Sequence, residues 1–133
     1  MSASNYLENK ILDHVFGGGD YARPATVHVA LHTADPTETG ATGEVTGGSY
    51  ARVAVTNNAT NFPAAASGAK ANDTVIQFPD PTANWGTVSH FSIWDAASGG
   101  NCLMIAALAQ SKAVNNGDPG PRFPVGELDL TCD

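Results

Sequence analysis

The spacing of apolar residues changes at Pro24, and this change constrains the fold more than any other feature of the sequence. Before Pro24, apolar residues recur every four positions, as on one face of an α-helix. They are Leu7, Ile11 and Val15, with Leu12 beside them. After Pro24, Val27, Val29 and Leu31 alternate with other residues, which is the pattern of a half-buried β-strand. We therefore expect one N-terminal helix followed by a β domain.

The N-terminal helix is predicted to span residues 4–17. Ser4 or Asn5 can cap its start, and Glu8, three residues after Asn5, completes a capping-box-like pair. Three consecutive glycines from Gly17 end the helix, because glycine tolerates left-handed backbone conformations. A helix of about three turns is marginal alone in water. Its apolar stripe is therefore expected to dock against the rest of the domain or against another subunit.

The remaining chain contains short segments with strand patterns, separated by turns rich in Gly and Pro. They are residues 27–31, 52–56, 74–78, 87–95 and 128–130. Residues 102–110 are apolar and suit either a strand that forms a central hairpin with 87–95 or a helix. Since a sheet with one apolar face must bury it against another layer, we predict a mainly β fold. Specifically, we expect 133 residues in a single domain, with residues 25–133 forming an antiparallel β-sandwich or jelly roll.

The charge distribution argues against nucleic acid and membranes as partners. Thirteen acidic and six scattered basic residues give a net charge of -7, without the concentrated positive face that phosphates require. The longest apolar run has about 8 residues, less than half of a membrane span. Residues 1–10 lack a signal-peptide pattern, which favours synthesis in the cytosol. We accordingly expect Cys102 and Cys132 to be reduced thiols.

Candidate metal ligands have the wrong spacing. His28 and His32 lie four apart, which separates them by about 13 Å along a strand, so they cannot share a metal and are expected on its wetter face. Asp35, Glu38 and Glu44 could offer oxygens to calcium, but their loop lacks EF-hand spacing and Asp-Pro is a common turn opener. We predict no metal site and no cofactor.

Catalytic patterns are equally weak. Glu127 and Asp129 share a strand face, as an acid/base pair requires, but alternating charges on a solvated edge strand explain them as well. No serine lies in a Gly-x-Ser-x-Gly elbow. Trp85 is most simply a core residue, the alternative being an exposed anchor for a partner or a sugar. The sequence therefore predicts no enzyme.

Two connections are long for so small a domain, at residues 33–49 and 57–73. Loops of this length in a compact domain are usually functional or are ordered by a neighbour. We expect the same for both of these loops.

Several motifs carry a family likeness that covers nearly the whole chain. They are SNYLENKILDHVFG at residues 4–17, VALHTADP at 29–36, GSYAR at 48–52, HFSIWDAASGGN at 90–101 and VNNGD at 114–118. The chain resembles a family of small tailed-bacteriophage virion proteins often labelled tail fibre proteins. The resemblance implies a non-enzymatic structural component of a phage particle, made in the cytoplasm of the host bacterium.

The place on the particle is argued from size. A fibre needs length, whereas a compact domain of this size has a radius of gyration of about 14 Å and the sequence contains no shaft or repeat. We favour a capsid decoration or cement protein, a homotrimer bound to the major capsid protein on the capsid surface. The alternative is a tail fibre or tail-tip component that binds other tail proteins or the host surface.

An interface is expected on the helix and on the first long loop. The candidate residues are Leu7, Ile11 and Val15 on the helix, Asp35 and Glu38 on the loop, and Trp85 as an exposed aromatic in the fibre alternative. Changing Leu7 and Ile11 together to Asp is expected to abolish particle association while the β domain stays folded.

Overall fold

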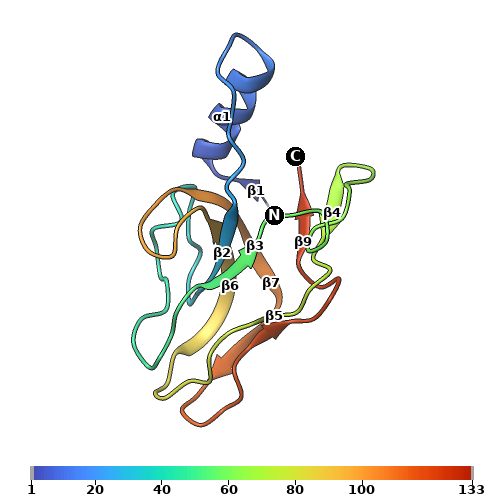
Figure 1. Ribbon diagram of the computed structural model, residues 1–133. Coiled ribbons are helices and arrows are strands. Elements are labelled where there is room, and N and C mark those ends of the chain that lie inside the picture. Colours follow the sequence, from blue (N-terminus) through green and yellow to red (C-terminus); the bar gives the residue numbers. More distant parts are fainter. Residues whose placement is uncertain (1, 133) are drawn as a thin grey trace.

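The computed structural model describes residues 2–132 and is mainly β, with antiparallel sheets (Figure 1). A five-stranded sheet has the order β1-β7-β6-β2-β3. Its strands are β1 (Ser2–Ala3), β2 (Thr26–His32), β3 (Val53–Thr56), β6 (Gly86–Trp94) and β7 (Cys102–Val114). Two small sheets pair β4 (Ala69–Ala71) with β9 (Asp129–Thr131) and β5 (Ile76–Gln77) with β8 (Arg122–Phe123). The predicted mainly β, antiparallel class is confirmed, and the jelly-roll strand order stays a prediction.

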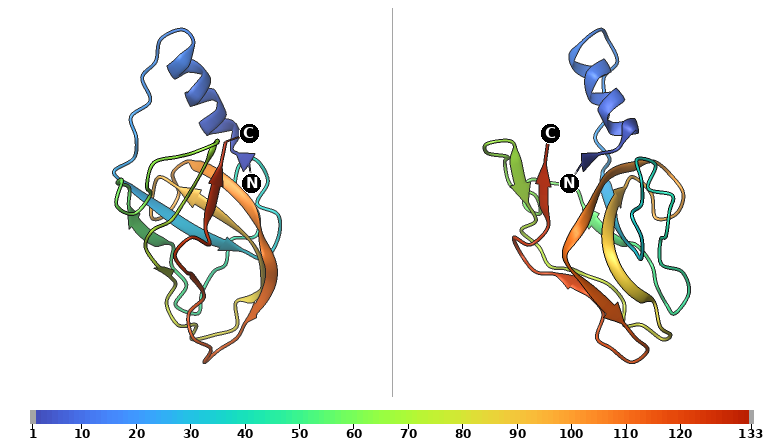
Figure 2. Two further views of the ribbon diagram at one scale, coloured as in Figure 1. Left: turned by 90° about the vertical axis from the view of Figure 1, so that its right-hand side faces the viewer. Right: turned by 180° about the vertical axis from the view of Figure 1, so that it is seen from behind.

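The small sheets lie on one side of the five-stranded sheet, and the hydrophobic core fills the space between them (Figure 2). Alternation along β2 turns Val27, Val29 and Leu31 into this core, as predicted from their spacing. The opposing side chains come from residues in or next to the small sheets. They include Ile76, Phe78, Phe123 and Leu128. Two apolar layers are thereby buried against each other, as a sheet with one apolar face requires.

The predicted central hairpin is present as β6 and β7. Asp95 closes its turn by accepting hydrogen bonds from the backbone N and the side-chain amide of Asn101, at 2.7 and 2.9 Å. Gly100 has a φ of +76°, and a Cβ there would lie 2.6 Å from that of Ala96, so this turn requires glycine. The alternative that residues 102–110 form a helix is wrong, because the strand continues to Val114.

The interior of β2 corrects one expectation. His32 is fully buried, whereas period-two alternation placed it on the wetter face of the strand. The loop 33–49 folds back over this end of β2, where the backbone N of Val45 donates to the carbonyl of Leu31 at 3.0 Å. This loop is therefore ordered by its own domain, and no neighbour is needed to order it.

The second long connection, 57–73, is also partly structured by the domain. It contains β4, and Phe62 within it is buried in the core. Asn72 is buried as well, and its amide donates to the carbonyls of Thr74 and Pro124 while its oxygen accepts from the backbone N of Leu128. Of the predicted strand 74–78, only β5 forms, where Ile76 and Gln77 pair with Phe123 and Arg122 of β8.

The N-terminal helix, α1, spans Asn5–Val15, close to the predicted 4–17. Ser4 caps it by accepting a hydrogen bond from the backbone N of Leu7, so the box expected between Asn5 and Glu8 is not the one that forms. Ser4 also anchors the helix to β7, since its backbone N donates to the carbonyl of Leu103 and its hydroxyl to that of Cys102. No helix in residues 2–132 is long and apolar enough to cross a membrane.

Candidate assembly surface

The helix α1 projects from one end of the β domain and contacts it through its first turn (Figures 1 and 2). Tyr6 and Leu7 pack against the core, but no residue of the helix is buried. Beyond the first turn its apolar side chains face solvent. The exposed fractions are 37% for Ile11, 55% for Leu12, 61% for Val15 and 73% for Phe16. We call these four residues the helix face.

The stripe was expected to dock against its own domain or against another subunit. Within its own domain Leu7 packs on the core, whereas Ile11 stays partly exposed. A short amphipathic helix gains most of its stability from packing of its apolar face. Contiguous exposed apolar side chains on a small protein mark an interaction surface more often than isolated ones do. The helix face is thus the strongest candidate for assembly in the described part of the chain, and Ile11 and Val15 were among the residues predicted for it.

A hollow of about 300 Å³ lies at the base of the helix, and we call it the basal groove. Residues far apart in the sequence form it, from α1, β1, β4, β7 and β9. Its described lining residues are Ala3, Leu7, Ile11, Ala65, Gly68, Ala69, Lys70, Met104, Leu130, Thr131 and Cys132. The lining is almost wholly apolar, and Lys70 is its charged residue. Sequence reasoning missed this groove, because only Leu7 and Ile11 carried a signal in the sequence.

The other predicted interface residues lie elsewhere. Asp35 lines a separate hollow with Ser2 and His90, and its carboxylate accepts a hydrogen bond from the backbone N of Thr37 at 2.9 Å. Glu38 is exposed on the loop 33–49. The structure does not bring these two carboxylates together with the helix stripe.

Trp85 lies in the core and is 6% exposed, as its core interpretation predicts. Its indole Nε1 donates to the carbonyl of Gly48 at 3.0 Å, and its ring meets that of Tyr50 edge-on at 5.4 Å. An exposed anchor at this position does not fit such a buried side chain.

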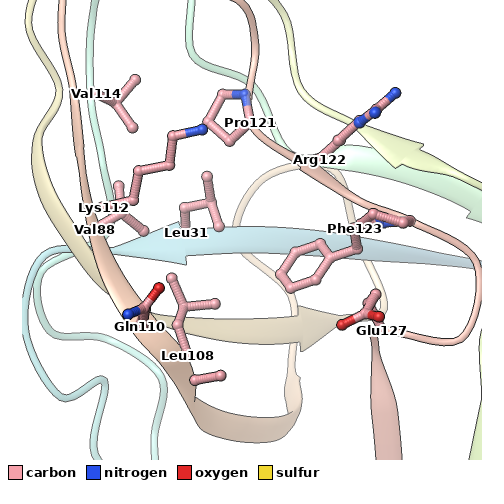
Figure 3. Close-up of a pocket in the computed structure, with 12 residues that line it drawn as sticks. Leu31, Val88, Leu108, Gln110, Lys112, Val114, Pro121, Arg122, Phe123 and Glu127 are labelled. Carbon is pink, nitrogen blue, oxygen red and sulfur yellow. The ribbon is translucent and has the colours of Figure 1, made fainter.

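A second hollow, of about 240 Å³, separates β7 from β8 (Figure 3). Leu31, Leu108 and Phe123 point into it, and Lys112 and Glu127 lie at its rim. Glu127 lines a neighbouring hollow with Asp129, but it lies outside β9, which begins at Asp129, so the two residues do not share a strand face as predicted. Both are exposed to solvent, whereas a general acid is usually set apart by an apolar environment. The geometry fits charges on a solvated edge.

Glu44 forms a partly buried ion pair rather than part of a calcium loop. Arg52 binds its carboxylate with two nitrogens, at 2.8 and 2.9 Å, and the hydroxyl of Tyr50 donates to it at 2.8 Å. Burial alone would raise the pKa of Glu44, but the hydrogen bonds from Arg52 and Tyr50 outweigh it and lower that pKa. Within residues 2–132, no group of three His, Cys, Asp or Glu side chains is arranged to hold a metal.

Arg52 also links this pair to the β6–β7 turn. Its guanidinium lies 4.0 Å from the ring centre of Trp94 and donates to the carbonyls of Ala96 and Gly99 at 3.0 Å. Through Glu44 on one side and Trp94, Ala96 and Gly99 on the other, Arg52 holds the loop 33–49 and the turn in place relative to each other. Arg52 thus serves the fold.

His32 and Ser92 resemble a nucleophile and its base but are sealed inside the protein. The imidazole Nε2 lies 2.6 Å from the hydroxyl of Ser92, and both residues are fully buried. Burial also raises the pKa of the Cys102 thiol to about 12, which keeps that thiol protonated at neutral pH. Cys102 and Cys132 are both free thiols, as predicted, the first buried and the second exposed. Neither the Ser92 hydroxyl nor the Cys102 thiol is accessible to a substrate, because both residues are buried.

The antiparallel β layers and the projecting apolar helix define a small β domain with one exposed apolar helix. The chain belongs to the Gp80 family, described as podophage GP4 fiber I protein gp80, whose model matches residues 2–131. The family predicted from the motifs is confirmed, and the chain is a structural protein of a bacteriophage virion. A search of curated proteins found no match.

Proposed function

We propose that this chain is a non-enzymatic building block of a phage fibre and that it assembles through its helix α1. The observation that carries the proposal is the exposed helix face, which projects from the β domain with no partner within the described chain. The family description, which names a fiber protein, supports the fibre rather than the capsid surface that size alone favoured.

The module is compact, and the described chain contains no coiled coil or repeat that would serve as a shaft. Its contribution to a fibre is therefore as an adaptor, a tip or one unit of a stack. Each of these roles requires protein–protein contacts rather than chemistry. An apolar surface held away from the body of the domain suits them all.

Gold-labelled antibodies against the β domain test this location on intact virions. Label at the tail or at its appendages, seen by electron microscopy, is the expected result. A control with particles from a phage lacking this chain must show no label. Label spread over the whole head would contradict the fibre assignment.

The second candidate is a capsid decoration protein, a homotrimer on the major capsid protein. The compactness of the domain favours it, since decoration proteins need no length. It predicts that removal of the chain weakens the capsid against heat, whereas loss of a fibre component leaves the capsid unchanged and impairs attachment to cells.

A further inference from the structure

We infer that the exposed end of the helix face of one copy of this chain, formed by Leu12, Val15 and Phe16, binds in the basal groove of a second copy. The inference names the partner for the surface on which the proposed function rests. It is argued from the chemistry of the two surfaces, from their separation and from their charges.

The two surfaces have matching chemistry. The basal groove is apolar, and Gly68 and Ala69 in its wall leave room for close approach of large side chains. The helix face supplies such side chains, with Val15 and Phe16 the most exposed. Burying apolar surface of this kind from both sides is what drives association of proteins in water.

The helix cannot fill its own groove. Leu7 and Ile11 of the same chain already line the groove, and Val15 lies four residues beyond Ile11, which is about 6 Å further along the helix at 1.5 Å per residue. The far end of the helix face therefore points away from the groove of its own chain. Only another molecule can bring such a helix end to the groove.

The charges favour a copy of the same chain as that molecule. Lys70 is the charged residue of the basal groove. The end of the helix that would enter it carries Asp13, three residues before Phe16, and the fully exposed Asp20, four residues after Phe16, whose carboxylate lies 3.8 Å from His14. Phe16 caps the last helical turn, which contains Asp13, since its backbone N donates to the carbonyl of Leu12 at 2.8 Å, so Asp13 would approach Lys70 when Phe16 enters the groove.

Every copy carries both surfaces, and this determines the kind of assembly. Two copies can exchange helices about a two-fold axis, or each helix can enter the next copy around a closed ring. In both cases the helix face and the groove are buried together in a closed oligomer.

Disulfide trapping tests the contact with purified protein, apart from any virion. The substitution Phe16→Cys places a thiol on the helix face, and native Cys132 supplies an exposed thiol in the groove. Mild oxidation is expected to give a covalent dimer or ring on a non-reducing gel, at least tenfold more than in a Val125→Cys control. Val125 is 52% exposed and lies outside both surfaces.

Adding Cys132→Ser to Phe16→Cys should remove this product. Sedimentation provides an independent check without cysteine chemistry, since the pair Leu12→Asp and Val15→Asp should convert the oligomer to monomer. A wild-type chain that stays monomeric at high concentration, or equal cross-linking in the Val125→Cys control, would overturn the inference. If the inference failed in this way but the helix variants were still absent from virions, the proposed function would stand, with a different partner for the helix.

Discussion

At the scale of single residues, His32 shows how this chain fills its interior with polar groups. Its Nδ1 lies 2.8 Å from the carbonyl of Thr42 and must donate to it, so Nε2 accepts from the hydroxyl of Ser92. The oxygen of Ser92 in turn accepts from the indole of Trp94 at 2.7 Å. In this network the neutral imidazole carries its proton on Nδ1, and the proton of the Ser92 hydroxyl points to Nε2.

This network predicts a loss of stability in mild acid. Burial lowers the pKa of His32 below its usual 6.5, so below that pH the unfolded chain binds a proton that the folded chain does not. The contribution of His32 to the free energy of unfolding is thus fully present above pH 6.5. It falls as the pH decreases, by at most about 1.4 kcal/mol per pH unit for this one group.

Urea unfolding between pH 7.5 and 5.5 measures this slope. In His32→Gln the absolute stability falls, but the dependence on pH attributable to this group disappears. An identical slope in the two proteins would show that His32 does not titrate with unfolding.

Arg52 gives a second prediction at this scale. Arg52→Lys removes the two-nitrogen contact with Glu44 and the stacking on Trp94, and it is expected to cost about 3 kcal/mol of unfolding free energy. Denaturant unfolding measures this change. In the matched control Asp20→Asn, which removes an exposed partner of His14, the midpoint should not move. Equal behaviour of the two variants would contradict the role given to Arg52.

At the scale of elements, long periodic segments were predictable and short ones were not. The four-residue spacing gave α1, and alternation gave β2, β6 and the start of β7. The predicted strands at 74–78 and 128–130 overlap β5 and β9, but their partners β4 and β8 were missed, because strands of two or three residues, some beside prolines, have no measurable period. His32 was misplaced because alternation identifies the two faces of a strand but not the loop that covers one end.

Of the two surfaces in the proposed contact, only the helix stripe could be predicted from the sequence. The stripe at Ile11 and Val15 follows from spacing within one helix. The groove that we assign to a second copy is assembled from α1 and four separate strands. Met104 and Leu130 lie in segments with predicted strand patterns, but nothing in those patterns shows that they meet Ala65 and the helix. Such a site depends on the tertiary structure.

The structure also sharpens the test of the helix. Leu7 packs on the core, so changing Leu7 and Ile11 to Asp, as the sequence suggested, would disturb the domain as well as its surface. The pair Leu12→Asp and Val15→Asp avoids this, since both side chains are more than half exposed. These variants should fold with an unchanged circular dichroism spectrum.

The incorporation of the helix double variant is measured by complementing a phage that lacks the gene and quantifying the protein in purified virions. We expect at least a tenfold loss relative to wild type. Val125→Asp, on an exposed apolar residue elsewhere, should incorporate normally. Normal incorporation of the helix double variant would show that α1 is not the attachment element.

At the scale of the whole molecule, the chain is a compact virion module with one apolar projection. Its core closes between the sheets, its buried residues His32, Asn72 and Ser92 form hydrogen bonds within the domain, and its helix projects from one end. Because the core does not depend on the exposed helix face, the domain can fold before it assembles. A fibre then gains its length from several chains rather than from this one.

The copy number per virion tests this account most directly. Quantitative mass spectrometry of purified particles, with the major capsid protein as the internal standard, measures it. The account predicts a few to a few tens of copies, as a fibre component requires. Hundreds of copies in a simple ratio to the capsid protein would contradict it and place the chain on the head.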